Sequence, residues 1–521
     1  MTAPRVIAEP LGGSALSLAV QRGEFDASIV APAPRSTPEW KAHAQAVARG
    51  APERWFDEVR AAFGDARGAP ERLARTARAG GIVVTTGQQA GLFGGPIYTW
   101  SKALAALALA DALERATGVP AAPVFWAATD DADFAEASRT YVVGNGGVAC
   151  LELSAPPPVG TPMALAPLGD ASPLLARLRD ACGSMAYERA YAAVEDAYRA
   201  SPTVGGAYVR LLRALLEPLG VAVLDASHPA VRRAGAGVHR RALEGAADVS
   251  RALAARQAWL VKHGFEPQVA DVPALSTVFV YERGTKRRVP LSEAGALANA
   301  DGTEFGPNVL LRPVVERTVL PTVAYVAGPG ELAYFAQVSA VAEALGAPQP
   351  VAVPRWSCTI VEPAVERALE RLGAGVDDMR DTTALERRVA RAAIPDGVRQ
   401  ALFALRGAVS EQLALLAASD AASPEGALLD SAVVEGAARQ LGFRLDRLER
   451  RLAAAAKRRG SDALRDLQAA RDALWPTGHR QERTLNFIPL LARYGDALWT
   501  AMRASADSYA ARLVAGVGDG G

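Results

Sequence analysis

A glycine-rich segment has the residue types of a turn that binds small anions. Gly87, Gly91 and Gly95 would let the backbone approach a ligand closely, and Gln88 and Gln89 add paired hydrogen-bond donors and acceptors. The helix expected to follow would offer free N–H groups to a phosphate or carboxylate. The spacing matches neither a Walker loop nor Gly-x-Gly-x-x-Gly, so a tight strand-to-helix turn without a ligand is the alternative.

Three further side chains flank this turn. Thr86 precedes it, and Tyr98 and Lys102 follow it one helical turn apart, on the same side of the expected helix. We expect Lys102 to act in catalysis, and Thr86 and Tyr98 to contact a substrate or nucleotide.

A second candidate is a group of acids just after an apolar run at 123–126. Asp130, Asp131 and Asp133, with Glu136 close behind, would repel one another unless cations or donors lie nearby. They could hold Mg²⁺ beside a nucleotide, or orient the amine of a substrate. The alternative is a solvated helix N-terminus, where acids are favoured by the helix dipole.

A third cluster lies between residues 308 and 355. Gly328-Pro329-Gly330 forms a second glycine-bearing turn, and Glu331 opens the helix after it. Arg312 could pair bidentately with a carboxylate or phosphate, but a structural ion pair with Glu316 or Glu331 is the alternative. We expect Glu331 to be catalytic, and the remaining members of the cluster to bind substrate or nucleotide: Asn308, Arg312, Gly328, Tyr334, Gln337 and Arg355.

The elements around these residues alternate between strand and helix. Strands are expected at 82–85, 123–126, 221–224, 277–282, 286–291, 322–327 and 351–353, and helices at 98–114, 208–216, 230–263 and 331–345. This order predicts an α/β fold, a Rossmann-like and mostly parallel sheet covered on both faces. Ligands of such sheets bind at the carboxyl ends of the strands, where all three clusters fall. The predicted core spans residues 1–362, with insertions at about 140–200 and 230–300.

The chain becomes helical after Pro363. Apolar residues recur at alternating spacings of four and three from Val434 to Ala455, and a second stripe runs from Val398 to Leu416. These patterns predict an antiparallel coiled-coil arm over 363–475, with a reversal at 423–426, that would join two copies as a homodimer. An ordinary helical bundle is the alternative. Residues 476–521 are expected to dock back on the core.

Composition narrows the class of protein. The 57 Lys and Arg residues balance 56 Asp and Glu residues, a net charge of +1, so we expect no nucleic-acid partner. The most apolar helical stretch noted, 103–113, is too short to span a bilayer, and the N-terminus does not look like a secretion signal. The three cysteines and five histidines show no metal-binding spacing. We therefore expect a cytoplasmic protein with buried free thiols and no structural metal.

Together these segments resemble the bacillithiol-biosynthesis family of cysteine ligases, in consistent order from about residue 80 to 500. The resemblance is carried by Thr86–Phe93, Gly95–Thr99 with Lys102, Pro123–Trp126 with the following acids, Asn308–Pro313, Leu320–Thr322, Gly328–Glu331, Tyr334, Gln337, Pro354–Arg355, Gln481–Arg483, Asn486–Phe487 and Ala492–Gly495.

The resemblance implies a Rossmann-like core with inserted segments and a coiled-coil domain that pairs protomers. It also implies that the cysteine carboxyl is joined to the amine of glucosaminyl malate. Because such an amide needs an activated carboxyl, ATP or ADP is the expected nucleotide, with Mg²⁺ as a possible companion. A nucleotide-dependent transferase using the same pocket and a non-catalytic pathway scaffold are the alternatives.

The sequence departs from the family pattern at two positions. The family carries a histidine where this chain has Ala132, and another where it has Arg139. If either imidazole transfers protons in the family, this protein must use another group.

Overall fold

The computed structural model describes residues 3–64, 69–144, 146–270, 272–392, 394–422, 428–458 and 462–517. The chain divides into two compact units, one made of residues 1–360 with 479–521 and the other of Val361–Gly478.

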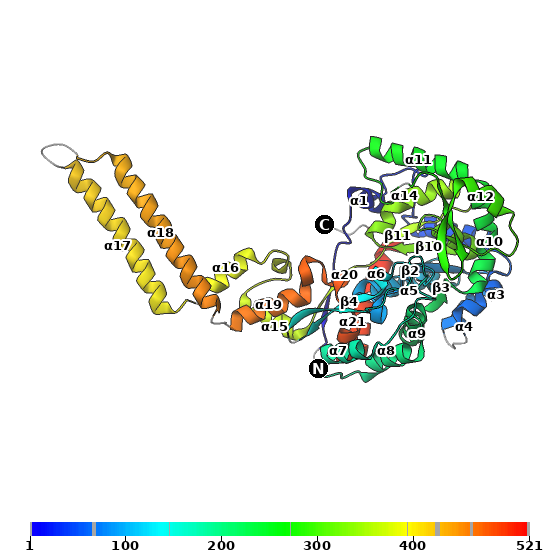
Figure 1. The fold of residues 1–521 in the computed structure, drawn as a ribbon, viewed down its shortest axis with the longest axis horizontal. Coiled ribbons are helices and arrows are strands. Elements are labelled where there is room, and N and C mark those ends of the chain that lie inside the picture. Colours follow the sequence, from blue (N-terminus) through cyan, green and yellow to red (C-terminus); the bar gives the residue numbers. More distant parts are fainter. Residues whose placement is uncertain are drawn as a thin grey trace. The chain divides into compact units, whose positions relative to one another are not determined.

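A five-stranded parallel sheet forms the centre of the first unit, with the strand order β11-β10-β2-β3-β6 (Figure 1). The strands are β2 (Ile82–Gln89), β3 (Ala121–Ala128), β6 (Ala222–Asp225), β10 (Thr322–Ala327) and β11 (Ala352–Pro354). The predicted α/β class is confirmed. From β2 the chain adds β3 and β6 on one side and β10 and β11 on the other, so the strand order reverses between β2 and β10.

Helices cover both faces of this sheet because its strands are apolar on both sides. In β2, Ile82 and Val84 pack into one core, whereas Val83 packs into the other. The first core includes α2 (Thr37–Arg49), α5 (Ile97–Thr117), α9 (Val204–Leu216) and α21 (Ile488–Ala515). The second includes α3 (Trp55–Val59), α10 (Pro229–Glu244), α13 (Arg312–Val319) and α14 (Pro329–Ala344).

Both inserted regions contain antiparallel strands that lie outside the parallel sheet. The first has the hairpin β4 (Arg139–Gly144) and β5 (Gly147–Glu152), followed by α7 (Ser172–Cys182) and α8 (Glu188–Ala200). The second has α11 (Ala246–Lys262), α12 (Leu291–Ala298) and a sheet of order β8-β7-β9, made of β7 (Leu275–Glu282), β8 (Thr285–Pro290) and β9 (Phe305–Pro307). The strands expected at 277–282 and 286–291 therefore pair with each other, and not with the Rossmann-like sheet.

Two other expectations were wrong in detail. The strand expected at 82–85 continues to Gln89, so Gly87, Gln88 and Gln89 belong to β2 and not to the turn. The helix expected at 230–263 is two helices that meet at Gly245. The other elements of this unit are β1 (Arg5–Ala8), β12 (Cys358–Val361), α1 (Ala15–Arg22), α4 (Ala69–Arg78), α6 (Phe134–Ala137) and α20 (Gln481–Thr484).

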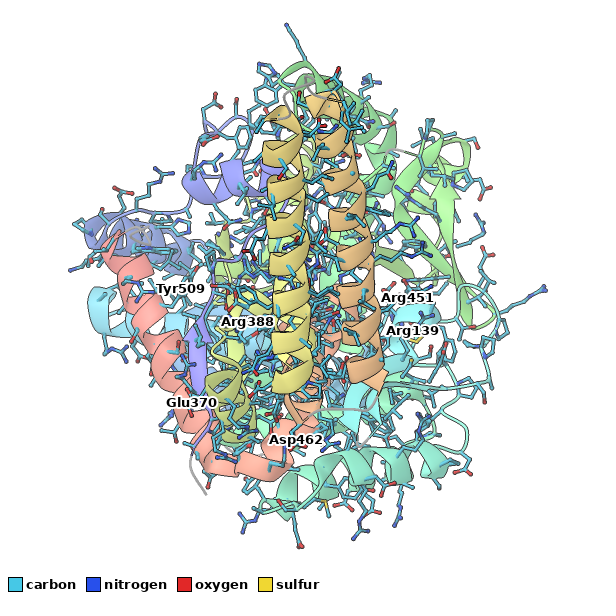
Figure 2. The ribbon with its side chains drawn as sticks, turned by 90° about the vertical axis from the view of Figure 1, so that its left-hand side faces the viewer. Arg139, Glu370, Arg388, Arg451, Asp462 and Tyr509 are labelled. Atoms are coloured by element: carbon cyan, nitrogen blue, oxygen red, sulfur yellow. The ribbon has the colours of Figure 1, made fainter. Side chains whose placement is uncertain are left out.

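The second unit is helical. It contains α15 (Pro363–Leu372), α16 (Thr383–Ala392), α17 (Asp396–Ala421), α18 (Ser431–Arg458) and α19 (Asp462–Leu474). The two predicted apolar stripes fall on α17 and α18, which lie side by side (Figures 1 and 2). The reversal expected at 423–426 lies outside the described residues.

The longest apolar helical window is not the one expected from the sequence. Among the described residues, α17 is the helix long and apolar enough to cross a membrane, with a mean hydropathy of 1.3, whereas 103–113 lies inside the buried helix α5. A single such helix is weak evidence for a membrane span.

Candidate active site

A cavity of about 960 Å³ opens where the strand order reverses, at the carboxyl ends of β2, β10 and β3. This is the position at which open α/β sheets bind ligands, and the volume is that of a small-molecule site. Gly87 and Gln88 from the first turn region and Gly328 and Glu331 from the second both line it. The two glycine-bearing regions therefore share one crevice, as expected.

Most of the predicted site residues line this cavity. They are Gly87, Gln88, Gln89, Tyr98, Lys102, Asp130, Asp131, Asp133, Asn308, Arg312, Gly328, Glu331, Tyr334 and Arg355. Four predicted binding residues lie outside its lining: Thr86, Gly91, Gly95 and Gln337.

The first of these four joins two strands, and the next two shape the turn after β2. The hydroxyl of Thr86 donates to the carbonyl of Val326, at 2.8 Å, and so ties β2 to β10. Gly91 and Gly95 pack against each other, since a Cβ on Gly91 would lie 2.8 Å from the Cα of Gly95. Gly95 also has a φ of 73°, which favours glycine. Gly91 and Gly95 therefore allow the close packing of this turn.

Gln337 does not line the cavity, but it holds Val269, which does. Its side-chain amide donates to the carbonyl of Val269 at 2.8 Å, and its Oε1 accepts the N–H of Val269 at 3.0 Å. Val269 and its neighbour Gln268 line the cavity. Gln337 therefore fixes the segment between α11 and β7 against α14.

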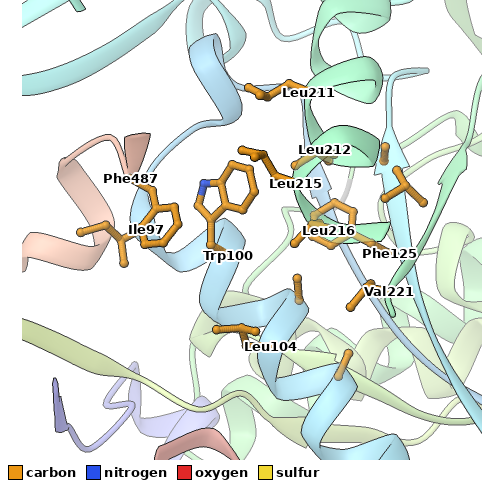
Figure 3. Close-up of a cluster of buried hydrophobic side chains, with 14 of the residues drawn as sticks. Ile97, Trp100, Leu104, Phe125, Leu211, Leu212, Leu215, Leu216, Val221 and Phe487 are labelled. Atoms are coloured by element: carbon orange, nitrogen blue, oxygen red, sulfur yellow. The ribbon is translucent and has the colours of Figure 1, made fainter. Parts of the chain in front are cut away.

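The start of α5 is held by an aromatic cluster. Trp100 is fully buried and stacks on Phe487, with ring centroids 5.3 Å apart, among leucines of α9 (Figure 3). A Cβ on Gly94 would lie 2.5 Å from the Trp100 ring, so this ring requires glycine there. The packing fixes the helical turns that carry Tyr98 and Lys102.

The N-terminus of α5 is not the open anion site that was expected. The N–H of Ile97 donates to the carbonyl of Leu485 at 3.0 Å, so the C-terminal segment occupies part of this helix end. Asn486 completes the arrangement by donating from Nδ2 to the carbonyls of Leu92, Phe93 and Gly95. An anion in the cavity would thus be bound mainly by side chains.

Lys102 and Glu331 form a buried ion pair in the cavity. The Nζ of Lys102 lies 2.6 Å from Oε2 of Glu331 and donates to the carbonyl of Gly87, also at 2.6 Å. Glu331 also accepts from Tyr325 at 2.5 Å and from the N–H of Gly328 at 2.6 Å, which caps α14. Burial lowers the pKa of Lys102. Burial also opposes ionisation of Glu331, but Lys102, Tyr325 and Gly328 together lower the pKa of this carboxyl.

Arg312 forms the structural ion pair that was the alternative interpretation. Its Nη1 donates to Glu316 Oε2 at 2.7 Å, and its guanidinium lies over the ring of Tyr325. Asn308 shapes this helix start, because its Oδ1 accepts the N–H groups of Leu310 and Leu311. The Nη2 of Arg312 is buried without a partner among the described residues, so Arg312 retains a donor for an anion.

Arg355 is also engaged by a carboxylate. Its two terminal nitrogens donate to the two oxygens of Glu482, at 2.8 and 2.7 Å, and both side chains are buried. Ser357 donates to the same carboxylate at 2.8 Å. The segment after the helical arm therefore reaches the cavity, which the sequence signalled only through the Gln481-Glu482-Arg483 signature.

The three predicted acids have different surroundings. Asp133 is exposed and caps α6 through the N–H of Glu136, so for this residue the helix-cap alternative is correct. Asp131 accepts from Gln89 and lies 3.6 Å from Lys286. Asp130 lines the cavity and is largely enclosed, and burial raises the pKa of its carboxyl.

Sequence reasoning missed the residues that the second insertion contributes. Lys286 and Arg288 on β8 and Phe279 on β7 line the cavity, and Arg483 and Trp126 join them. Lys286 and Arg288 alternate along β8, which indicates that their side chains share one face of the strand. The sequence does not indicate that this hairpin folds over the parallel sheet.

The lining suits an anionic nucleotide better than a metal held by protein side chains. Among the residues that the structure describes, no three His, Cys, Asp or Glu side chains form a metal-binding group. The three acids thus do not form a metal site by themselves, and a Mg²⁺ ion here would need ligands from the nucleotide as well. The buried Nη2 of Arg312 and the adjacent cations fit a phosphate.

The two departures from the family pattern lie in different places. Ala132 lines the cavity, so an imidazole is missing from its wall. Arg139 starts β4, and its Nη2 lies 3.7 Å from Oε1 of Glu152. It lines an adjoining hollow of about 650 Å³ and is not part of the cavity lining. Only the replacement at 132 therefore bears directly on this cavity.

Fold and cavity define a Rossmann-like α/β protein with a small-molecule site at the reversal of its strand order. The chain belongs to the bacillithiol biosynthesis BshC family. The model of the family's N-terminal Rossmann-like domain matches residues 57–356, and that of its C-terminal coiled-coil domain matches residues 358–513.

Curated relatives extend over most of the chain. A protein of Solibacter usitatus named "Putative cysteine ligase BshC" is 33% identical over 445 residues, 81% of this chain and 82% of the relative. Proteins of the same name from Koribacter versatilis and Symbiobacterium thermophilum are 33% and 31% identical, over 82% and 84% of this chain and equal shares of the relatives.

Proposed function

We propose that the protein is a ligase that joins the carboxyl of cysteine to the glucosamine amine of glucosaminyl malate. The observation that carries this proposal is one cavity, at the ligand position of a BshC-family Rossmann-like domain, that presents both carboxylates and cations. The names of the relatives support a cysteine ligase, and family membership does not favour a transferase or a scaffold.

The charges in the cavity suit the reactants. An amine needs a carboxylate to hold and deprotonate it, and Asp130 and Asp131 lie on one wall. The carboxylates of malate and the phosphates of a nucleotide need cations, which Arg312, Lys286 and Arg483 supply. An amide bond forms only from an activated carboxyl, so ATP is the expected cosubstrate, entering with its own Mg²⁺. ATP would supply the activation, and the unpartnered Nη2 of Arg312 would hold its phosphates.

The test is product formation by the purified full chain. The protein is incubated with cysteine, ATP, Mg²⁺ and glucosaminyl malate, and the amide is sought by mass spectrometry. Mixtures that lack ATP or contain serine in place of cysteine are the controls. If no amide forms under varied nucleotide and metal conditions, the proposal fails. A sugar nucleotide that co-purifies with the protein would instead favour a transferase.

We also propose that the helical arm joins two copies as a homodimer. Apolar side chains remain exposed on both long helices, with Phe403 80% and Phe443 60% exposed. None of the side chains of α17 is buried within one chain. Because exposed apolar stripes of this kind mark interaction sites, a second copy is the expected partner.

The mass of the full chain in solution tests the dimer. Sedimentation should give twice the chain mass of 54.4 kDa for the wild type, and one chain mass for a Phe403→Asp/Phe443→Asp variant. Gln412→Asp, at an exposed polar position on the same arm, should remain dimeric. A monomeric wild type, or a dimeric double variant, would contradict the proposal.

The cytoplasm is the compartment we propose. The three cysteines are free thiols, Cys182 and Cys358 buried and Cys150 half-buried, which fits a reducing environment. The pathway's small-molecule substrates support the same assignment. Fractionation of cells that express a tagged chain would test it, and recovery with the membranes would contradict it.

A further inference from the structure

The three acids that follow β3 differ in how far their carboxylates are already used. Asp133 caps α6, and Asp131 accepts from Gln89 and from the N–H of Ala132. The carboxylate of Asp130 accepts no hydrogen bond from any other residue that the structure describes, although it lines the cavity. Of the three, it is the carboxylate that other residues engage least, and it lies on the cavity wall.

The backbone around Asp130 is fixed on both sides. The carbonyl of Thr129 accepts the N–H of Ala164 at 2.9 Å, and the carbonyl of Asp131 accepts the N–H of Met163 at 2.8 Å. The carbonyl of Asp130 itself accepts from Lys286 Nζ at 2.5 Å. Its position is therefore set by two separate inserted segments before any ligand arrives.

Charged groups from several elements face this carboxylate. Burial raises the pKa of the Asp130 carboxyl, and Asp131 adds to this rise. Lys286 on β8 and Arg312 on α13 lower the pKa, but burial prevails. Burial raises the pKa of Tyr281 on β7, and the charge of Asp130 adds to this rise. A carboxylate with a raised pKa is a better proton acceptor than an exposed one.

We propose that Asp130 is the catalytic residue that accepts the proton of the substrate amine, a duty that no imidazole can perform at Ala132. The inference rests on the proposed ligase function. The substrate ammonium gives one proton to a carboxylate oxygen of Asp130, which leaves a neutral amine with a free electron pair. That pair attacks the activated cysteine carboxyl and forms the C–N bond. The phosphate or nucleoside monophosphate on the carboxyl leaves with the electrons of its C–O bond, and the second nitrogen proton passes to solvent.

Initial rates of amide formation by the full chain test this assignment. Asp130→Asn should lower kcat about 10²- to 10⁴-fold, the usual contribution of a proton-transfer group, while the KM for glucosaminyl malate changes less than threefold. The wild type should lose kcat at acid pH as Asp130 becomes protonated, and this fall should be absent in Asp130→Asn. Asp130→Glu should recover part of kcat and keep the acid limb. Asp301→Asn, at an exposed acid outside the cavity lining, should stay within threefold of the wild type.

A second variant adds a histidine at position 132 to the Asp130→Asn protein. In Asp130→Asn/Ala132→His the restored ring should raise kcat above that of Asp130→Asn, with a new pH dependence close to the pKa of about 6.5 that is normal for histidine. Thermal unfolding of each variant guards against a folding defect, and Asp130→Glu retains the charge if Asp130→Asn does not fold.

Two failures can be told apart. A wild type that makes no amide overturns the ligase proposal together with this inference. A wild type that makes the amide, beside an Asp130→Asn variant with unchanged kcat or an unchanged acid limb, overturns only the role of Asp130. A loss confined to KM would also overturn it, since that result would make Asp130 a binding group.

Discussion

The ion pair between Lys102 and Glu331 joins the helices that begin on the two sides of the sheet's reversal point. Lys102 lies on α5 after β2, and Glu331 caps α14 after β10, with 2.6 Å between Nζ and Oε2. Because Lys102 is only 2% exposed, its charge depends on this partner. The pair thus links the two halves of the cavity.

Removal of one member of this pair should be strongly destabilising. We expect Glu331→Gln to lower the free energy of unfolding by about 3–5 kcal/mol, because it leaves a buried ammonium without a counter-charge. Urea unfolding of the purified variant measures the loss. Asp446→Asn, which breaks the exposed Arg406 pair on the arm, is the control and should cost about 0–1 kcal/mol. Equal losses would contradict the argument.

Glu482 should make the protein sensitive to acid. Burial opposes its ionisation, but Arg355, Ser357 and the N–H of Cys358 together lower its pKa below the usual 4.5. For a carboxyl with a lowered pKa, the stabilisation is complete above about pH 4.5 and is lost as the pH falls through the folded-state value. Urea midpoints between pH 3 and 7 should show this fall, and Glu482→Gln should flatten it. An equally steep fall in the variant would exclude Glu482 as a cause.

Glu217 should make the protein less stable as the pH rises, which is the opposite of the effect of Glu482. It is 7% exposed, its Oε1 has no hydrogen-bond partner among the described residues, and burial raises its pKa to about 7. A carboxyl with a raised pKa binds its proton more tightly when folded, so stability falls as the pH rises from about 4.5 to 7. Glu217→Gln should therefore stabilise the protein at pH 8 by roughly 1–3 kcal/mol. The exposed Glu244→Gln should show no such gain in the same unfolding measurement.

Asn486 should control the shape of the turn between β2 and α5. Its Nδ2 lies 3.1–3.3 Å from three carbonyls of this turn. Asn486→Ala removes this donor from the buried carbonyls of Phe93 and Gly95, which should cost about 1–3 kcal/mol and raise the KM of the proposed reaction. Asn299→Ala, whose amide makes a single exposed bond, is the matched control. A KM that does not change would show that the turn keeps its shape without Asn486.

Local patterns predicted the elements that build the parallel sheet, because each strand is a short apolar run bounded by glycine or proline. They also predicted that two glycine-bearing regions meet, because the carboxyl ends of parallel strands share one edge. The roles of single residues were harder to predict. Arg312 and Arg355 look like free anion ligands in the sequence, yet Glu316 and Glu482 hold them.

The contribution of Lys286 could not be predicted for a different reason. It comes from a separate antiparallel sheet, and its position depends on how an insertion folds back over the strand ends. Helix and strand periodicity carries no information on that step. Glu482 and Asn486 raise the same difficulty, because more than 100 residues of helical arm separate them from the core segments that they contact.

Glu482 and Asn486 lie near the C-terminal end of the sequence, so the cavity can be completed only after most of the chain has been synthesised. On the ribosome, the Rossmann-like sheet could begin to form once β11 has emerged, yet Arg355 and the carbonyls of the β2–α5 turn would still lack their partners. A nascent chain would have to extend beyond the whole arm before its crevice could take its final form. Substrate capture would therefore be among the last abilities that a newly synthesised molecule acquires.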